Sequence, residues 1–168
     1  MLCEFDGDRI RPTGDKVRES LFNILQFKVL GASFLDLFCG TGAMGIEALS
    51  RGAKCVVFND YSKDSLNLLK KNLSKLKVDE QYAIKNFDAV TYLESTSDKF
   101  DIVYIDPPYA SDLGERALKV ACRVLSDEGI VILESEREFC ESVSDLTVYD
   151  KRKYGRAYLT FFKKGETL

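Results

Sequence analysis

The sequence predicts an α/β fold: a three-layer, Rossmann-like arrangement in which a mostly parallel seven-stranded sheet carries helices on both faces. Strand and helix patterns alternate along the chain at the spacing of βαβ units. A glycine-containing turn at residues 40–45 follows the first core strand. The last two strands lie too close for a crossover helix, so they should form a hairpin with one strand antiparallel to the rest. The length of 168 residues suits a single domain, residues 1–168.

The first half of the chain alternates between helical and strand patterns. Val17, Leu21, Ile24 and Leu25 share one face of a helix predicted over residues 15–28. Short apolar runs predict strands over residues 33–38 and 54–59, separated by a helix that follows the glycine turn and ends near residue 50. A leucine repeat then predicts a helix over residues 62–77.

The second half continues the alternation and ends in strands. A strand over residues 82–87 precedes a short helix, and a strand over residues 100–105 ends just before Asp106. The next helix presents an apolar face formed by Leu113, Ala117, Val120, Ala121 and Val124. The last three strands are predicted over residues 129–134, 146–151 and 157–163. In open sheets of this kind ligands lie beyond the carboxyl ends of the strands, so residues there are the candidates for function.

The composition excludes several kinds of chemistry. The chain has no histidine, and its five cysteines stand at no zinc-type spacing, so we expect no metal and no Ser-His or Cys-His nucleophile. No apolar run approaches the roughly 20 residues that cross a bilayer, and the polar N-terminus lacks a signal-peptide core. We therefore expect a cytoplasmic protein with reduced thiols and no membrane contact. The net charge of −3 means that any contact with nucleic acid needs a local basic patch.

The glycine turn indicates a cofactor. Gly40, Gly42 and Gly45 match the dinucleotide fingerprint, which also has an acidic residue about 20 residues further on. A tight turn with no ligand is the alternative. Asp36, just ahead of the turn, would repel a pyrophosphate, whereas S-adenosyl-L-methionine has an ammonium and a sulfonium group. The turn therefore favours S-adenosyl-L-methionine over NAD.

Two more carboxylates end neighbouring strands. Asp60 could accept hydrogen bonds from both ribose hydroxyls. Asp88 could accept one from the adenine amino group while the Ala89 N–H donates to the ring. Both aspartates also have structural alternatives: each could cap the helix that follows, and Asp60 could instead be a solvated strand end. Phe38 and Tyr61 adjoin these turns and are expected at the same cofactor site.

The segment Asp106-Pro107-Pro108-Tyr109 follows the fourth strand and is the candidate catalytic segment. Two adjacent prolines hold an extended backbone whose carbonyl oxygens lack local donors. These oxygens and the Asp106 carboxylate could accept both hydrogens of an exocyclic amino group and aim its lone pair at a methyl carbon. Asp106 could also take the departing proton, and Tyr109 offers a flat face for a base. The alternative is a rigid loop with a buried tyrosine. Cys39, in the cofactor turn, is expected to be a small apolar filler rather than a nucleophile.

Several motifs together resemble the RsmD family, the 16S ribosomal RNA guanine-N2 methyltransferases. The similarity runs from about Arg11 to Phe162. The opening motif and the Tyr-Gly near the end are more specific than the others, which many amino methyltransferases share. The markers are Arg11-Pro12-Thr13, Lys16-Val17-Arg18-Glu19, Phe22-Asn23-Ile24-Leu25, Leu35-Asp36-Leu37-Phe38-Cys39-Gly40-Thr41-Gly42, Glu47-Ala48-Leu49-Ser50-Arg51-Gly52, Asp106-Pro107-Pro108-Tyr109 and Lys153-Tyr154-Gly155.

The resemblance implies a class I methyltransferase fold and methyl transfer to the 2-amino group of one guanine in 16S rRNA. The implied substrate is an assembling small ribosomal subunit, and we expect the enzyme to be a monomer. Residues 1–30, a segment and a helix, would flank the active site. Family members usually begin with a basic hairpin, whereas acidic residues such as Glu4, Asp6 and Asp8 precede Arg11 here. RNA contacts are expected from Arg11, Thr13, Lys16, Arg18, Lys153 and Tyr154, although a solvated hairpin would equally explain the last two.

Other functions compete with this interpretation. An amino methyltransferase acting on DNA adenine or on a protein glutamine would need the same tetrapeptide, but 168 residues leave little room for a separate DNA-reading domain. An NAD-dependent oxidoreductase would share the glycine fingerprint. A non-catalytic assembly factor would keep the fold, but the intact tetrapeptide at residues 106–109 argues against it.

Overall fold

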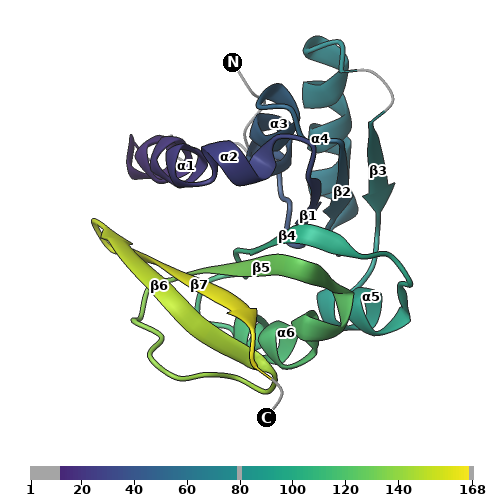
Figure 1. Ribbon diagram of the computed structural model, residues 1–168. Helices are drawn as coiled ribbons and strands as arrows, with labels where there is room; N and C mark the ends of the chain where they lie inside the picture. The colour runs from purple at the N-terminus through teal and green to yellow at the C-terminus, as the bar shows by residue number, and fades with distance from the viewer. Residues whose placement is uncertain (1–11, 79–80, 167–168) are drawn as a thin grey trace.

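One seven-stranded sheet forms the centre of the protein, and the computed structural model describes residues 12–78 and 81–166 (Figure 1). The strand order is β3-β2-β1-β4-β5-β7-β6. Strands β1 to β5 pair in parallel, whereas β7 is antiparallel to both of its neighbours. The predicted sheet, mostly parallel with one antiparallel strand, is thereby confirmed. The strands are β1 Ser33–Asp36, β2 Cys55–Asn59, β3 Tyr82–Lys85, β4 Phe100–Ile105, β5 Leu125–Ser135, β6 Leu146–Tyr154 and β7 Ala157–Lys164.

Helices cover both faces of this sheet, as the alternating pattern predicts (Figure 1). One face packs against α1 Pro12–Ile24, α2 Gln26–Val29, α3 Ala43–Ser50 and α4 Lys63–Lys75. The other face packs against α5 Ala89–Ser95, α6 Leu113–Ala121 and the 3₁₀ helix η1 Cys122–Val124.

Each buried strand contributes to both layers of the core, because successive side chains point to opposite faces. Phe34 of β1 and Ile102 of β4 pack with α1, α3 and α4, while their neighbours Leu35 and Val103 pack with α5 and α6. All four side chains are at most 1% exposed. This double burial explains why the central strands have continuous apolar sequences rather than alternating ones.

The helix predicted over residues 15–28 is interrupted at Leu25 and begins earlier, so the single-helix prediction is wrong. The backbone of Leu25 has φ −84° and ψ 0°, outside the helical range, and it separates α1 from α2. The change of direction keeps Leu25 and Val29 buried while Phe27 is 89% exposed. An apolar repeat detects such buried positions but does not detect one residue with a shifted ψ.

Several strand ends also differ from the prediction. β1 and β3 each stop two residues earlier than predicted, because the chain turns at residues 37–38 and bends at residue 87. β5 instead begins at Leu125, where it pairs with Phe100 before an irregularity in the register. β6 continues to Tyr154 because the hairpin pairs along its whole length, up to Tyr154 and Ala157. Across residues 12–78 and 81–166, no helix combines the length and the apolar character that crossing a membrane requires.

Candidate active site

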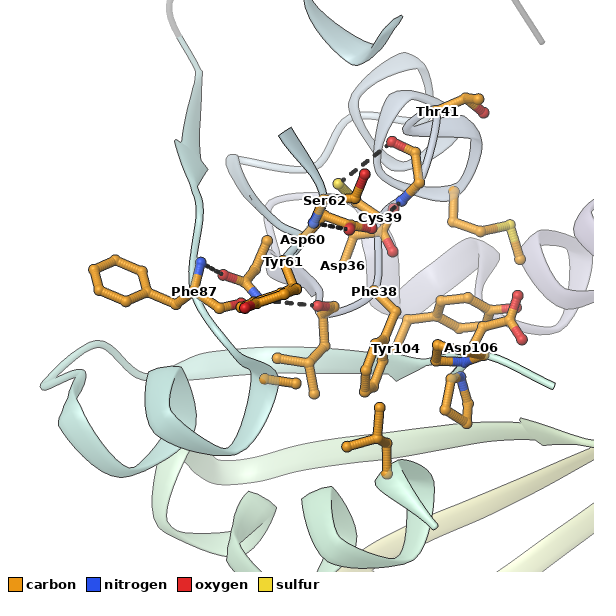
Figure 2. A pocket seen from close by; sticks show the side chains of 18 of the residues that line it. Asp36, Phe38, Cys39, Thr41, Asp60, Tyr61, Ser62, Phe87, Tyr104 and Asp106 are labelled. Atoms are coloured by element: carbon orange, nitrogen blue, oxygen red, sulfur yellow. Dashed lines mark hydrogen bonds between the residues drawn. The ribbon is translucent and has the colours of Figure 1, made fainter. Parts of the chain in front are cut away.

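A cavity of about 850 Å³ opens at the carboxyl ends of β1 to β4 (Figure 2). Its volume lies within the range of roughly 300–1,000 Å³ that is typical of ligand sites. The glycine turn and Tyr109 line the same cavity, so a cofactor at the turn and a base beside Tyr109 would lie close together. The predicted residues that line it are Asp36, Phe38, Gly40, Asp60, Tyr61, Asp88, Ala89, Asp106, Pro107, Pro108 and Tyr109.

Gly42 is not among the lining residues, but it shapes the turn. Its φ is +87°, in the left-handed region that favours glycine. A Cβ atom built on Gly42 would lie 2.2 Å from Cδ1 of Leu69 in α4, and one on Gly45 would lie 2.3 Å from Cε1 of Phe58 in β2. These two glycines therefore let the turn and the start of α3 pack closely on their neighbours.

Asp36 is a buried carboxylate at the floor of the cavity. It is 1% exposed, and its Oδ2 accepts a hydrogen bond from the Gly45 N–H at 3.0 Å. Burial raises the pKa of Asp36 from 3.8 to about 7; the Gly45 hydrogen bond opposes that rise. A cationic ligand beside Asp36 would stabilise the ionised form, because opposite charges attract strongly where water is excluded.

We expect the buried Asp36 to make the protein's stability depend on pH. The folded-state pKa of about 7 lies above the unfolded value of 3.8, so the contribution is fully present below pH 3.8 and is lost as the pH rises through 7. The free energy of unfolding of the wild type should fall relative to that of Asp36→Asn by up to about 1.4 kcal/mol per pH unit in this window. Urea denaturation of both proteins without cofactor, from pH 4 to pH 8, measures the difference. Parallel profiles would contradict it.

Asp60 holds the glycine turn against the end of β2. Its Oδ2 accepts from the Gly40 N–H at 2.9 Å and its Oδ1 accepts from the Ser62 N–H at 2.8 Å, as the dashed lines in Figure 2 show. The capping residue of α4 is Ser62, whose side chain accepts from the Ser65 N–H. The alternative in which Asp60 caps the helix is therefore wrong. Each carboxylate oxygen has a second lone pair, so these bonds leave acceptor capacity for ribose hydroxyls.

Asp88 caps α5, as its structural alternative predicts. Its Oδ1 accepts from the backbone N–H of Thr91 at 3.0 Å and from the Thr91 hydroxyl at 3.1 Å. The Thr91 backbone hydrogen bond is the main cause that lowers the pKa of Asp88. Asp88 and Ala89 both line the cavity, so capping fixes the loop from which an adenine contact would be made.

Two asparagines that the sequence interpretation missed connect the loops that follow β1, β2 and β3. Nδ2 of Asn59 donates to the Leu37 and Phe87 carbonyls, each at 3.1 Å, and Oδ1 accepts from the Phe87 N–H. Nδ2 of Asn86 donates to the Asp60 and Tyr61 carbonyls, each at 2.9 Å. Asn59 is 1% exposed at the end of an apolar strand, and this buried polar position is the signal that could have identified it.

The candidate catalytic segment, residues 106–109, departs from the sequence-based prediction at one carbonyl and rules out the alternative given for it. The Ser111 hydroxyl donates to the Pro108 carbonyl at 2.7 Å, so the expectation that neither proline carbonyl has a local donor is wrong for Pro108. Ala110, with φ +53°, turns the chain back and makes this contact possible. Tyr109 is 80% exposed, so the alternative of a loop with a buried tyrosine is also wrong. The ring is available for stacking at the mouth of the cavity.

Cys39 occupies the glycine turn as a neutral thiol. It is 7% exposed, and burial is the main cause that raises its pKa far above the usual value. A thiol that stays protonated is a poor nucleophile. The structure therefore supports the interpretation of Cys39 as a filler.

The charge of the lining suits a cationic cofactor. Among the described residues that line the cavity there are four aspartates, at positions 36, 60, 88 and 106, and no lysine or arginine. A pyrophosphate would meet only like charge in this cavity, whereas an ammonium and a sulfonium would be attracted. The residues present fit S-adenosyl-L-methionine better than NAD. Within residues 12–78 and 81–166, no cluster of three or more acidic or cysteine side chains has a geometry that could hold a metal ion.

Among the described residues, the predicted RNA contacts Lys16, Arg18, Lys153 and Tyr154 do not line the cavity. Lys16 and Lys153 are exposed; Arg18 pairs with Asp15 at 3.2 Å, and Lys153 Nζ lies 5.1 Å from the ring centroid of Tyr158. The partly buried Tyr154 packs against the core. Neighbouring hairpin cations are also paired locally, Lys151 with Glu138 and Arg152 with Asp150. Arg11 and the side chain of Thr13 lie outside the described residues.

The chain is similar to known proteins along most of its length. The family model described as "Conserved hypothetical protein 95" matches residues 1–163. The chain is 38% identical over 142 residues to the ribosomal RNA small subunit methyltransferase D of Haemophilus influenzae, which covers 82% of this chain and 74% of that protein. It is 36% identical over 135 residues to the protein of the same name from Escherichia coli strain K12, over 79% of this chain and 68% of that protein.

Solved structures show the same fold. The proposed methyltransferase yhhF of Escherichia coli superposes with a TM-score of 0.83 at 28% identity, over 95% of this chain and 92% of that chain. The 16S rRNA N2 methyltransferase RsmC of Thermus thermophilus, in complex with AdoMet and guanosine, superposes with a TM-score of 0.75 at 22% identity. That superposition covers 95% of this chain and 45% of RsmC, and at this identity it shows the fold alone.

Proposed function

Because the chain belongs to the ribosomal RNA small subunit methyltransferase D family, we propose that it transfers a methyl group from S-adenosyl-L-methionine to the 2-amino group of a guanine in 16S rRNA. One observation supports this proposal above all. The acidic glycine-turn site and the segment Asp106 to Tyr109 line a single cavity. A bound cation and an exocyclic amine would therefore meet at the end of β4.

The cofactor side of the cavity comprises Asp36, Asp60, Asp88 and Ala89. S-adenosyl-L-methionine, when bound, supplies an electrophilic methyl group on its sulfonium. Asp36 attracts the positive charge of the ligand, and Asp60 accepts hydrogen bonds from the ribose hydroxyls. Asp88 and the Ala89 N–H recognise the adenine edge. The hydrogen bonds that Asp60 and Asp88 already make fix both carboxylates before the ligand arrives, which lowers the entropic cost of binding.

On the substrate side, Asp106 accepts hydrogen bonds from the amine that receives the methyl group. The lone pair of a base amine is delocalised into the ring, and acceptors for its hydrogens help to localise that lone pair and to orient it. Orientation of this kind can contribute roughly 7–11 kcal/mol to a group transfer. Asp106 then either takes the departing proton or leaves it to bulk water. Tyr109 stacks on the base, which contributes about 1–3 kcal/mol.

We propose that the enzyme acts as a monomer on the assembling small ribosomal subunit rather than on free RNA. The net charge of −3 gives little general attraction to RNA. Recognition would then depend on local contacts, for which Lys16, Arg18, Lys153 and Tyr154 are the described candidates, and on the shape of the particle.

Methyl transfer to purified particles tests the function. We expect 30S particles from cells that lack this protein to accept labelled methyl groups from S-adenosyl-L-methionine, and mass spectrometry of the 16S rRNA should locate one N2-methylguanine. Particles from wild-type cells, already methylated at that guanine, serve as the control and should accept almost none. Equal labelling of both preparations, or a label in adenine, would contradict the proposal.

A further inference from the structure

Tyr104 occupies an unusual place in the cavity. It is the penultimate residue of β4, lines the cavity and is 2% exposed. Its hydroxyl donates a hydrogen bond to Oε2 of Glu134, near the end of β5. Figure 2 shows the same hydroxyl beside the carboxylate of Asp106, at the substrate end of the cavity. The methyl transfer described above uses neither Tyr104 nor Glu134.

The strand register explains why two carboxylates flank this hydroxyl. β4 and β5 run in parallel, with Ile105 opposite Leu133, so Asp106 and Glu134 follow at the same level. Burial, and then the charges of Asp106 and Glu134, raise the pKa of Tyr104 far above its usual value. Tyr104 therefore remains a neutral phenol with a single proton to donate.

The direction of the hydroxyl hydrogen decides whether Tyr104 donates a hydrogen bond to a ligand or accepts one from it. A tyrosine hydroxyl has one hydrogen and can also accept, whereas an ionised carboxylate only accepts. Because the hydrogen points to Glu134, the lone pairs of the Tyr104 oxygen point elsewhere. At the Asp106 side of the hydroxyl, the cavity then presents a hydrogen-bond acceptor and not a donor.

We propose that Tyr104, oriented by Glu134, selects guanine by accepting the N1–H that adjoins the 2-amino group held by Asp106. This inference rests on the proposed function and deepens it. Guanine carries a hydrogen on N1, next to its 2-amino group. Adenine carries a lone pair on N1, next to its 6-amino group. An oxygen that presents only lone pairs to the base would favour the N1–H edge of guanine and repel the N1 lone pair of adenine.

The two residues have different roles in this proposal. Tyr104 determines specificity because it contacts the base, and Glu134 is a positioning residue because it acts only through the hydroxyl of Tyr104. A neutral amide at position 134 could either accept from the hydroxyl or donate to it, so Glu134→Gln would release the orientation. Tyr104→Phe would remove the acceptor and leave the ring in place.

A base analogue separates specificity from general damage. 2,6-Diaminopurine has the same 2-amino group as guanine but carries a lone pair on N1. Small subunits reconstituted with guanine or with 2,6-diaminopurine at the methylated position provide the two substrates, and the ratio of their kcat/KM values is measured. We expect the kcat/KM of the wild type to be about tenfold or more higher for guanine than for 2,6-diaminopurine. The reason is that guanine donates a hydrogen bond to Tyr104 from N1, whereas 2,6-diaminopurine places a lone pair there. The ratio should fall toward one in Tyr104→Phe and in Glu134→Gln.

The double variant tests the coupling. If Glu134 acts through the hydroxyl, Glu134→Gln should change the ratio little once Tyr104→Phe is present. Two controls match the substitutions. Tyr92→Phe removes a buried hydroxyl outside the cavity lining, and Glu128→Gln changes an exposed carboxylate toward the other end of β5. Both controls should keep the wild-type ratio.

The outcomes separate this inference from the function on which it rests. A wild type that methylates both bases equally, or variants that keep the wild-type ratio, would overturn the role of Tyr104 while leaving the methyltransferase intact. A wild type that methylates neither particle would instead overturn the proposed function. Thermal unfolding checks each variant. Should Tyr104→Phe fail to fold, the ratio for Glu134→Gln, whose side chain is only partly buried, decides the matter.

Discussion

Replacement of Asp106 by alanine should lower kcat by about a hundredfold to a thousandfold while the Kd for S-adenosyl-L-methionine changes by less than about threefold. The magnitude corresponds to removing one oriented hydrogen-bonding group that acts at the reacting atom. Cofactor affinity should persist because the contacts proposed for the cofactor come from Asp36, Asp60 and Asp88, which lie at or just beyond the ends of the other strands β1, β2 and β3. Single-turnover kinetics on small subunits and calorimetry with the cofactor measure the two quantities separately.

Two further variants sharpen this test of Asp106. Asp106→Asn keeps one acceptor oxygen and the shape of the side chain, so its kcat should lie between those of the alanine variant and the wild type. Asp112→Ala is the matched control, because Asp112 is exposed just before α6 and lies outside the cavity lining. It should keep normal rates. Near-normal turnover by Asp106→Ala would show that the amine is oriented by other groups.

Replacement of Asp60 by alanine should raise the Kd for S-adenosyl-L-methionine by about ten- to a hundredfold. Hydrogen bonds to a charged group contribute about 1.5–3 kcal/mol, and the substitution removes the acceptor proposed for the ribose. It also removes the two bonds that hold Gly40 and Ser62, so the turn itself should become less ordered. Isothermal titration calorimetry gives the Kd, and thermal unfolding reports the loss of the internal bonds.

The design for Asp60 distinguishes ligand contact from support of the turn. Asp64→Ala, at an exposed position in the first turn of α4, serves as the control and should bind cofactor normally. Binding of S-adenosyl-L-methionine and of an analogue without ribose hydroxyls can be compared in Asp60→Ala. If Asp60 contacts the ribose, the variant should discriminate less between them. An unchanged Kd for the intact cofactor would remove Asp60 from the binding site.

The sequence predicts the sheet and most of the cavity because both depend on local patterns. Apolar runs in the order of βαβ units indicate parallel strands, and the carboxyl ends of such strands meet at one edge. Asp36 and Asp106 directly follow apolar residues and Asp60 comes two residues after Phe58, so their meeting in one cavity follows from topology alone. No knowledge of side-chain contacts is needed for that step.

The groups that the sequence interpretation missed are joined by contacts between distant positions. Asn59 bonds to backbone groups of Leu37 and Phe87, which lie 22 and 28 residues away. Tyr104 and Glu134 are 30 residues apart. In the sequence, Tyr104 cannot be distinguished from the other core residues of its apolar strand. The bond from Ser111 to Pro108 depends on the left-handed backbone of Ala110, which no pattern in the sequence indicates.

The two outer strands of the described sheet also bear on how the protein behaves at high concentration. β3 has only four residues, and β6 carries Lys151, Arg152 and Lys153 next to a register irregularity at Val148 and Asp150. Short strands, lysine-rich strands and bulges each discourage a second sheet from adding to an open border. We therefore expect β-sheet extension between copies to be unfavourable, which would leave the cavity at the carboxyl ends of the strands accessible to a large substrate.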